Sequence, residues 1–174
     1  SVSNAVVGEA KPVPKRRNKG ESANSRLTAK ALARAHAKPI ADAVGAAQFG
    51  VGTPGGTDAF SHAVQVEAVR RPGAAFVALD MRDASPSLDR DVVLAAVGLR
   101  APSLLPYARI FLGRRSYYRY LGADGEGGAL PAEQGADHGD PLAPAFLAVT
   151  VRGPLERLGV RLRELAEEEG YTPD

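Results

Sequence analysis

The chain has 174 residues, of which 44% are hydrophobic and 24% are charged, and it contains no cysteine. These proportions are typical of one globular domain with a sizeable core, and the absence of cysteine excludes disulfides, thiolate metal ligands and a cysteine nucleophile. No apolar run approaches the eighteen or so residues that a membrane-spanning helix needs, so we expect no membrane span.

The net charge of +2 conceals an uneven distribution along the chain. Residues 1–40 contain nine Lys or Arg and two Glu, a balance of +7, whereas residues 41–174 contain thirteen Lys or Arg and eighteen Asp or Glu. A segregated basic arm is typical of a protein that binds polyphosphate, because condensed counterions are released when Lys and Arg neutralise phosphates. A solvated, mobile tail is the alternative interpretation.

The N-terminal part of the chain is predicted to be a basic arm, residues 1–24, followed by one domain, residues 25–174. Within the arm, residues 11–20 combine five basic residues with two prolines, which predicts an exposed inserted loop. An amphipathic basic helix is then predicted from Ser25 to His36, ending near Pro39, because apolar residues recur at helical spacing. The candidate nucleic-acid-binding residues of these segments are Lys11, Lys15, Arg16, Arg17, Lys19, Arg26, Lys30 and Arg34.

A glycine-rich stretch, Gln48–Thr57, precedes a second predicted helix that runs to about Arg70, with Thr53 or Thr57 as its N-cap. The exposed amides of such a stretch can hold a phosphate at a helix N-terminus. A glycine turn before a helix is more often only a turn.

The central element is predicted to be a buried strand, Ala74–Met81, which places the carboxylate of Asp80 at its C-terminal end. Ser87 is then predicted to cap a helix from Leu88 to about Gly98. The expected buried stripe of that helix consists of Leu88, Val92, Ala95 and Ala96. A further short helix is predicted over Tyr107–Leu112.

A β-hairpin is predicted next, with a strand over Ser116–Leu121, a turn over Gly122–Gly128 and a return strand over Ala129–Gln134. Alternation along the first strand puts Tyr118 and Tyr120 on one face and Tyr117 with Arg119 on the other.

The tyrosines of this predicted hairpin lie beside Arg114, Arg115 and Arg119. Rings interleaved with guanidinium groups can stack bases and hold phosphates. A half-buried hairpin without a ligand has the same pattern, so both interpretations stay open.

Two helices are predicted at the C-terminal end. The first begins at Pro141 and turns Leu142, Phe146 and Leu147 inward. The second begins at Pro154 and carries Leu155, Leu158, Leu162 and Leu165 on one face, ending at Gly170. The alternation of helices with a few strands fits an α+β domain whose helices cover one face of a small sheet.

Two sequence blocks carry a family resemblance. The first contains Leu79, Asp80 and Ala84; the second contains Gly135, Gly139, Asp140, Pro141, Leu142 and Pro144. In this order and with this separation they resemble the palm of the reverse transcriptase (RNA-dependent DNA polymerase) of non-long-terminal-repeat retrotransposons. The glycine-rich residues 48–56 and the helix containing residues 26–32 extend the resemblance over nearly the whole chain.

The resemblance implies a partial fingers and palm fold, with helices packed on a small, mostly antiparallel sheet. It also implies that Asp80 and the Met81 carbonyl hold magnesium, because nucleotidyl transfer uses two divalent cations and magnesium prefers carboxylate and carbonyl oxygen. The residues that it places at the nucleotide are Met81, Ser85, His138, Gly139 and Asp140.

The chain departs from the family pattern at four places. Ser85 stands where the family has an aromatic residue, His138 where it has Gln, and Ser3-Asn4 where it has Arg-Pro. The family's Tyr-x-Asp-Asp strand does not occur before Asp174. We therefore expect Asp80 to be a vestigial or partial ligand of an incomplete metal site, with no cofactor for this chain and Mg²⁺ only as part of an intact polymerase.

Two functions remain open at this point. In the first, the chain is a reverse-transcriptase-derived, catalytically incompetent component of a larger assembly such as a ribonucleoprotein, where it binds RNA or the protein subunits that cover its open palm edge. In the second, it is a fragment of an active retrotransposon reverse transcriptase that performs magnesium-dependent, RNA-templated DNA synthesis. The resemblance implies a nuclear location, or a mitochondrial one if Ser1 follows a removed presequence.

Overall fold

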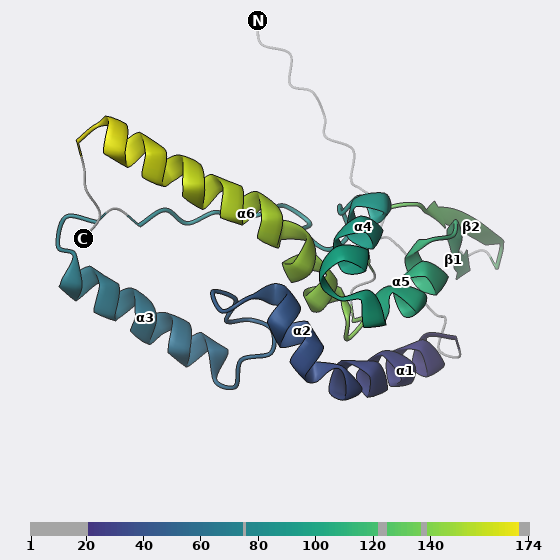
Figure 1. Ribbon diagram of the computed structural model, residues 1–174. Helices are drawn as coiled ribbons and strands as arrows, with labels where there is room; N and C mark the ends of the chain where they lie inside the picture. The colour runs from purple at the N-terminus through teal and green to yellow at the C-terminus, as the bar shows by residue number, and fades with distance from the viewer. Residues whose placement is uncertain (1–20, 75, 122–124, 137–138, 171–174) are drawn as a thin grey trace, which may run out of the picture.

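The computed structural model describes residues 21–74, 76–121, 125–136 and 139–170 (Figure 1). Within these ranges the chain forms six α-helices and one two-stranded antiparallel sheet, which confirms the α+β class. The predicted basic loop, with Lys11, Lys15, Arg16, Arg17 and Lys19, lies outside the described residues, as does His138. None of the described helices combines the length and the apolar run that crossing a membrane requires.

Two helices occupy the region where one was predicted: α1 (Glu21–Ala35) and α2 (Ala37–Val44). Pro39 was expected to end the helix, but it lies in the first turn of α2. Proline is tolerated there, because the N–H groups of a first turn have no partner within the helix. Ile40, Ala43 and Val44 of α2 are buried.

Helix α3 (Gly56–Arg70) confirms the second predicted helix, but not its cap. The residue before it is Gly55, with a φ of 62°, and no side chain caps the helix. A Cβ on Gly56 would lie 1.7 Å from the carbonyl oxygen of Phe49, so the loop passes too close for a larger residue. Thr53 instead donates its hydroxyl hydrogen bond to the Gln48 carbonyl, at 3.0 Å. Helix α3 has no buried residue.

The predicted buried strand is wrong. Residues 76–81 are irregular in the structure, and their side chains are exposed. A strand requires a neighbour to receive its backbone hydrogen bonds, and the described residues place none beside this segment.

Helix α4 (Arg90–Arg100) starts two residues later than predicted, because Asp89 and not Ser87 is its cap. The Asp89 carboxylate accepts hydrogen bonds from the amides of Asp91 and Val92, at 2.9 and 3.0 Å. The buried residues of α4 are Val93 and Val97, whereas Val92, which was expected to be buried, is 54% exposed. A short 3-10 turn, η1 (Pro102–Leu104), leads into α5 (Leu105–Leu112), which confirms the predicted helix there.

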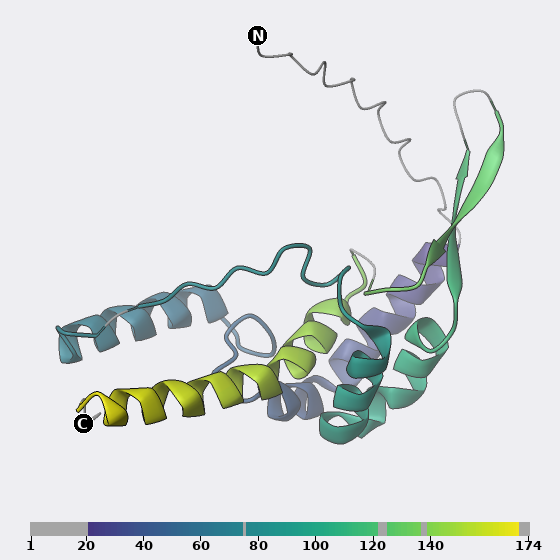
Figure 2. The same cartoon turned by 90° about the horizontal axis from the view of Figure 1, so that it is seen from above.

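The predicted hairpin is confirmed. Strand β1 (Ser116–Leu121) has the predicted bounds and pairs antiparallel with β2 (Gly127–Ala132), which begins and ends two residues earlier than the predicted return strand. The hairpin projects from the helices (Figure 2). The expectation that helices pack on the sheet is wrong, because the core lies among the helices themselves.

Helix α6 (Ala143–Glu168) is continuous through Pro154, so the predicted start of a separate helix at that residue is wrong. Its first two turns fill the core together with α2, α4 and α5. The largest fully buried side chains of this core are Phe146, Leu104, Leu142, Val93 and Val97. The Tyr107 ring of α5 lies 6.4 Å, centroid to centroid, from that of Phe146.

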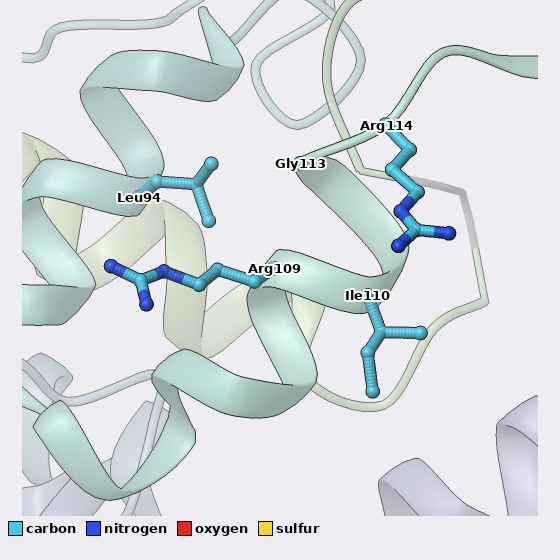
Figure 3. Close-up of a pocket in the computed structure, with 5 residues that line it drawn as sticks. All are labelled: Leu94, Arg109, Ile110, Gly113 and Arg114. Atoms are coloured by element: carbon cyan, nitrogen blue, oxygen red, sulfur yellow. The ribbon is translucent and has the colours of Figure 1, made fainter.

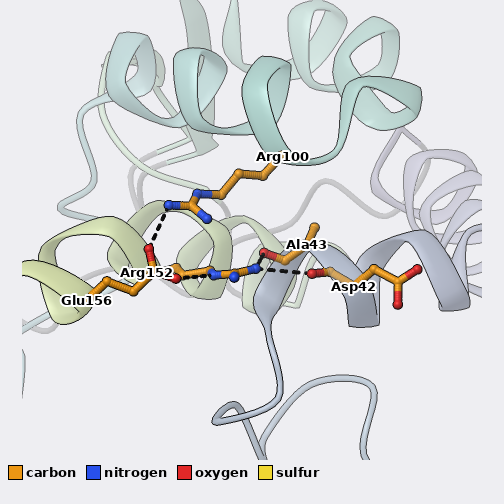
Figure 4. Close-up of polar contacts among 5 residues, drawn as sticks. All are labelled: Asp42, Ala43, Arg100, Arg152 and Glu156. Atoms are coloured by element: carbon orange, nitrogen blue, oxygen red, sulfur yellow. Dashed lines mark hydrogen bonds and ion pairs between the residues drawn. The ribbon is translucent and has the colours of Figure 1, made fainter. Parts of the chain in front are cut away.

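Arg152 and Glu156 together fasten α6 to two other helices (Figure 4). Its Nη1 donates to the carbonyls of Asp42 and Ala43 at the end of α2, at 3.1 and 2.8 Å. Its Nε donates to Glu156, which also accepts from Arg100 of α4, at 2.7 and 2.9 Å. Last-turn carbonyls of a helix need such partners, so this contact joins α2, α4 and α6.

Candidate functional site

Asp80, the predicted metal ligand, lies in the exposed segment 76–81 and not at the end of a buried strand. The side chain of Met81 beside it is 51% exposed. Among the described residues no group of three or more His, Cys, Asp or Glu lies close enough to hold a metal ion.

The turn after Asp80 sets the position of Ser85. Asp83 has a φ of 48°, a left-handed conformation that Asp tolerates better than most residues. The Ser87 amide donates to the Asp83 carbonyl at 2.9 Å and closes the turn. This reversal carries the chain from the exposed segment into the packed helices.

Backbone hydrogen bonds join the two blocks that were identified in the sequence. The Ala136 amide donates to the Ser85 carbonyl at 3.0 Å, and the Gly135 amide donates to the Leu88 carbonyl at 2.8 Å. Arg90 adds a bond from its Nε to the Gly135 carbonyl, at 3.1 Å. Residues about fifty positions apart are therefore held side by side.

Gly135 is required at this junction. Its φ is 65°, and a Cβ would lie 2.1 Å from the Pro86 carbonyl oxygen. Backbone oxygen cannot withdraw in the way that a flexible side chain can, so any larger residue forces the two blocks apart. Sequence analysis identified Gly135 only as a motif match; the close approach became visible in the structure.

Asp140, predicted to contact nucleotide, is engaged in the fold. Its carboxylate accepts a hydrogen bond from the Leu142 amide at 2.9 Å, and its carbonyl accepts one from the Ala143 amide at 3.1 Å, at the start of α6. The buried hydroxyl of Tyr107 bonds to the same carboxylate. Burial, and then the charge and hydrogen bond of Asp140, raise the pKa of Tyr107 well above its usual value.

The basic residues of α1 are exposed, and one of them reaches the second block. Arg26, Lys30 and Arg34 recur at intervals of four residues and so lie along one side of the helix. Gly139, with a φ of 91°, lies against the Arg26 guanidinium, since a Cβ there would be 2.8 Å from Nη2. The structure thus brings Arg26 together with Gly139 and Asp140.

The feature that sequence analysis missed is a set of three elements that each carry several exposed large apolar side chains: α3, residues 76–81, and α6 from Leu155 onward. We call these elements the open half. Figures 1 and 2 both show α3 and this end of α6 extending from the other helices, with residues 76–81 returning along the same part of the molecule. Its exposed apolar residues are Phe60, Val66, Val69, Phe76, Val77, Leu79, Met81, Leu155, Leu158, Val160, Leu162 and Leu165.

No family model, curated protein or solved structure matches this chain. The resemblance to reverse transcriptases therefore stays a prediction.

Proposed function

We propose that this chain is a reverse-transcriptase-derived domain that acts without catalysis, as a structural component of a larger assembly, and that a partner protein completes it by pairing with residues 76–81. The observation that carries the proposal is that this segment is exposed and unpaired. Its sequence has the apolar pattern of a buried strand, but no neighbouring strand in the described structure covers it.

The backbone of residues 76–81 offers the first support. Within the described chain no strand pairs with it, so its N–H and C=O groups face water. An extended segment with free backbone groups is a template for another strand. Addition of a partner strand is a common mode of protein recognition, in which main-chain hydrogen bonds supply affinity.

The side chains offer the second support. Phe76 is 56% exposed, Val77 79% and Leu79 67%. In an extended conformation Val77 and Leu79 share one face, and Phe76 lies on the other with Asp80. Full burial of each such apolar side chain contributes about 1.5–3 kcal/mol, so a partner that covers the segment gains stability from both faces.

The flanking helices offer the third support. Helix α3 buries none of its residues, and Leu158 and Leu162 of α6 are 40% and 55% exposed. Apolar exposure on three neighbouring elements is more than the single scattered residues found on ordinary surfaces. A protein partner fits this chemistry better than RNA does, while the basic side of α1 is the place where RNA contributes to the same assembly.

The test compares Leu79→Lys with the control Leu99→Lys in cells that make the full chain. Both leucines are exposed, at 67% and 79%, but Leu99 lies on α4, outside the open half. Sedimentation of the tagged chain is expected to show an assembly larger than the monomer, from which Leu79→Lys releases the chain and Leu99→Lys does not. A wild-type chain that sediments as a monomer, or two variants that behave alike, contradicts the proposal.

The hydrogen bond from the Ala136 amide to the Ser85 carbonyl favours the second candidate, a fragment of an active reverse transcriptase, because it brings together both blocks on which such an activity depends. Magnesium-dependent primer extension by the purified assembly separates the two. Extension by the wild-type assembly that is lost in Asp80→Asn supports the active enzyme and overturns the non-catalytic proposal. Absence of extension in an assembly that still depends on Leu79 supports the non-catalytic one.

A further inference from the structure

The outer face of the β1–β2 hairpin carries an exposed aromatic ring between two arginines. The register pairs Tyr117 with Pro131 and Arg119 with Ala129. Tyr117 is 55% exposed, because neither of the two small partners opposite covers it. Tyr118, on the other face, is partly buried, so the hairpin is half-buried and its Tyr117 face is open to a ligand.

An ion pair fixes the base of this face. Arg115, on the same side of β1 as Tyr117, binds the carboxylate of Glu133 just after β2. Glu133 is the main cause of the raised pKa of Arg115, and Tyr117 adds to it, which places the three side chains together. The charge of Arg115 is thereby compensated, whereas Arg119 forms no ion pair with another described residue.

An open hollow of about 510 Å³ lies beside the start of the hairpin, between α4 and α5. It is lined by Leu94, Arg109, Ile110, Gly113 and Arg114. Figure 3 shows the two guanidinium groups on opposite sides, that of Arg109 toward Leu94 and that of Arg114 on the side of Ile110. Two separated cations suit successive phosphates of a chain and not one small anion.

The backbone at Arg114 is held in place by hydrogen bonds, while its side chain lines the hollow. Arg90 donates from Nη1 to the Arg114 carbonyl at 3.3 Å and from Nε to the Gly135 carbonyl. Arg114 lies in the bend before β1, three residues before Tyr117, so at most about 11 Å of chain separates their backbones.

The acidic groups nearby are Asp89, Asp91 and Glu133, which line an adjoining hollow together with Arg114 and Arg115. Asp89 is engaged as the cap of α4, and Glu133 binds Arg115. The cationic and aromatic surface therefore consists of two parts. One is the side of the hairpin that carries Tyr117 and Arg119, and the other is the hollow that is lined by Arg109 and Arg114.

We propose that this surface binds single-stranded nucleic acid, with one base stacked on Tyr117 and neighbouring phosphates paired with Arg119, Arg114 and Arg109. Base stacking on an exposed ring is tolerant of sequence, and arginine pairs with the phosphates between stacked bases. An acidic peptide also pairs with arginines, but it has no base to stack on the exposed ring of Tyr117. The surface is separate from the open half, and the inference is independent of the proposed function.

The main test measures binding of fluorescein-labelled oligouridylate to the full chain by anisotropy. Tyr117→Ala is expected to weaken binding about 5- to 150-fold, the range for loss of one stacked base, and Tyr117→Phe to retain it. Tyr118→Ala is the matched control, since Tyr118 lies on the other face of β1. All three variants keep the charge of the chain, so the basic arm cannot produce a difference among them.

Charge is tested separately. Arg114→Gln and Arg109→Gln are each expected to reduce the slope of log affinity against log salt by about 0.7, whereas Arg163→Gln on α6 leaves binding through the hairpin unchanged. Ultraviolet crosslinking of the wild-type chain to oligouridylate should map to Tyr117, which keeps the test valid if a variant misfolds. Equal binding of heparin and RNA with no effect of Tyr117→Ala, preference for an acidic peptide, or crosslinks only elsewhere overturns the proposal.

Discussion

The two ends of α6 both carry large apolar residues but have opposite surroundings. From Leu142 to Val149 the apolar residues are packed among α2, α4 and α5, and Phe146 is 1% exposed. From Leu155 to Leu165 the apolar residues recur at the same helical spacing, yet they are 40–55% exposed. Both ends thus carry regularly spaced large apolar residues, but the first is almost without charge and is packed among other helices, whereas the second is rich in Arg and Glu and its apolar residues are exposed.

The same contrast extends to the whole chain. The packed half, formed by α2, α4, η1, α5 and the first turns of α6, holds the described core. Helix α3, residues 76–81 and the rest of α6 form the open half. An amphipathic pattern therefore reports which side of an element is to be covered; it does not report whether this chain or another molecule covers it.

The largest expected effect separates the halves directly. Leu142→Ala, at a residue that is 0% exposed, is expected to lower the free energy of unfolding by about 2–5 kcal/mol, because it removes buried methyl groups and leaves a cavity. Leu162→Ala, at 55% exposure on the same helix, is expected to change it by less than about 0.5 kcal/mol. Urea unfolding of the isolated chain measures both.

Equal losses for the two leucines would break the comparison, because they would mean that the isolated chain already covers the far end of α6. In the assembly the order changes. Leu162→Ala is then expected to weaken binding of the partner, while Leu142→Ala acts only through the stability of the chain.

The elements that could be predicted from the sequence are those that depend on local features, and those that could not be predicted depend on distant neighbours. The hairpin, α3 and α5 could be predicted because each depends on local features: alternation along Ser116–Leu121, glycine before a helix, and helical spacing of apolar residues. Residues 76–81 could not, because a strand is defined by its partner, and local pattern alone does not supply one. Val93 and Val97 were missed because apolar residues occur on every side of α4, so their spacing alone does not select the side that α5 and α6 cover.

The candidate site was predictable in its members and not in its contacts. Ser85, Gly139 and Asp140 were identified by motif, but the hydrogen bond between Ala136 and Ser85 arises from the folding of distant segments. The role of Asp140 just before α6 had a sequence signal that was not used: the side chain of an Asp in a turn commonly accepts a hydrogen bond from the amide two residues on.

A second, smaller effect tests the junction that connects the halves. Gly135→Ala is expected to lower the free energy of unfolding by about 3 kcal/mol, because its Cβ meets the Pro86 carbonyl and its φ is positive. Gly125→Ala is the matched control, since it also has a positive φ, 84°, but has no atom within 4 Å of its Cβ. Its expected cost is about 1 kcal/mol. A similar loss for both glycines would show that backbone conformation and not the close approach sets the requirement.

The smallest effect at neutral pH lies in the packed half, at the hydrogen bond between Tyr107 and Asp140. Because burial and the neighbouring carboxylate raise the pKa of Tyr107 in the folded chain, the unfolded chain loses its proton first as the pH rises. Stability is therefore fully present below the unfolded pKa of about 10 and falls above it, by up to about 1.4 kcal/mol per pH unit.

Tyr107→Phe, which cannot ionise, is expected to be about 1 kcal/mol less stable than wild type at pH 8 and to lose less stability above pH 10. Urea unfolding midpoints between pH 8 and 11 should thus converge. Parallel curves for the two proteins would show that ionisation of Tyr107 does not cause the loss of stability at high pH. Convergence would show that the ionisation of this one hydroxyl causes that loss.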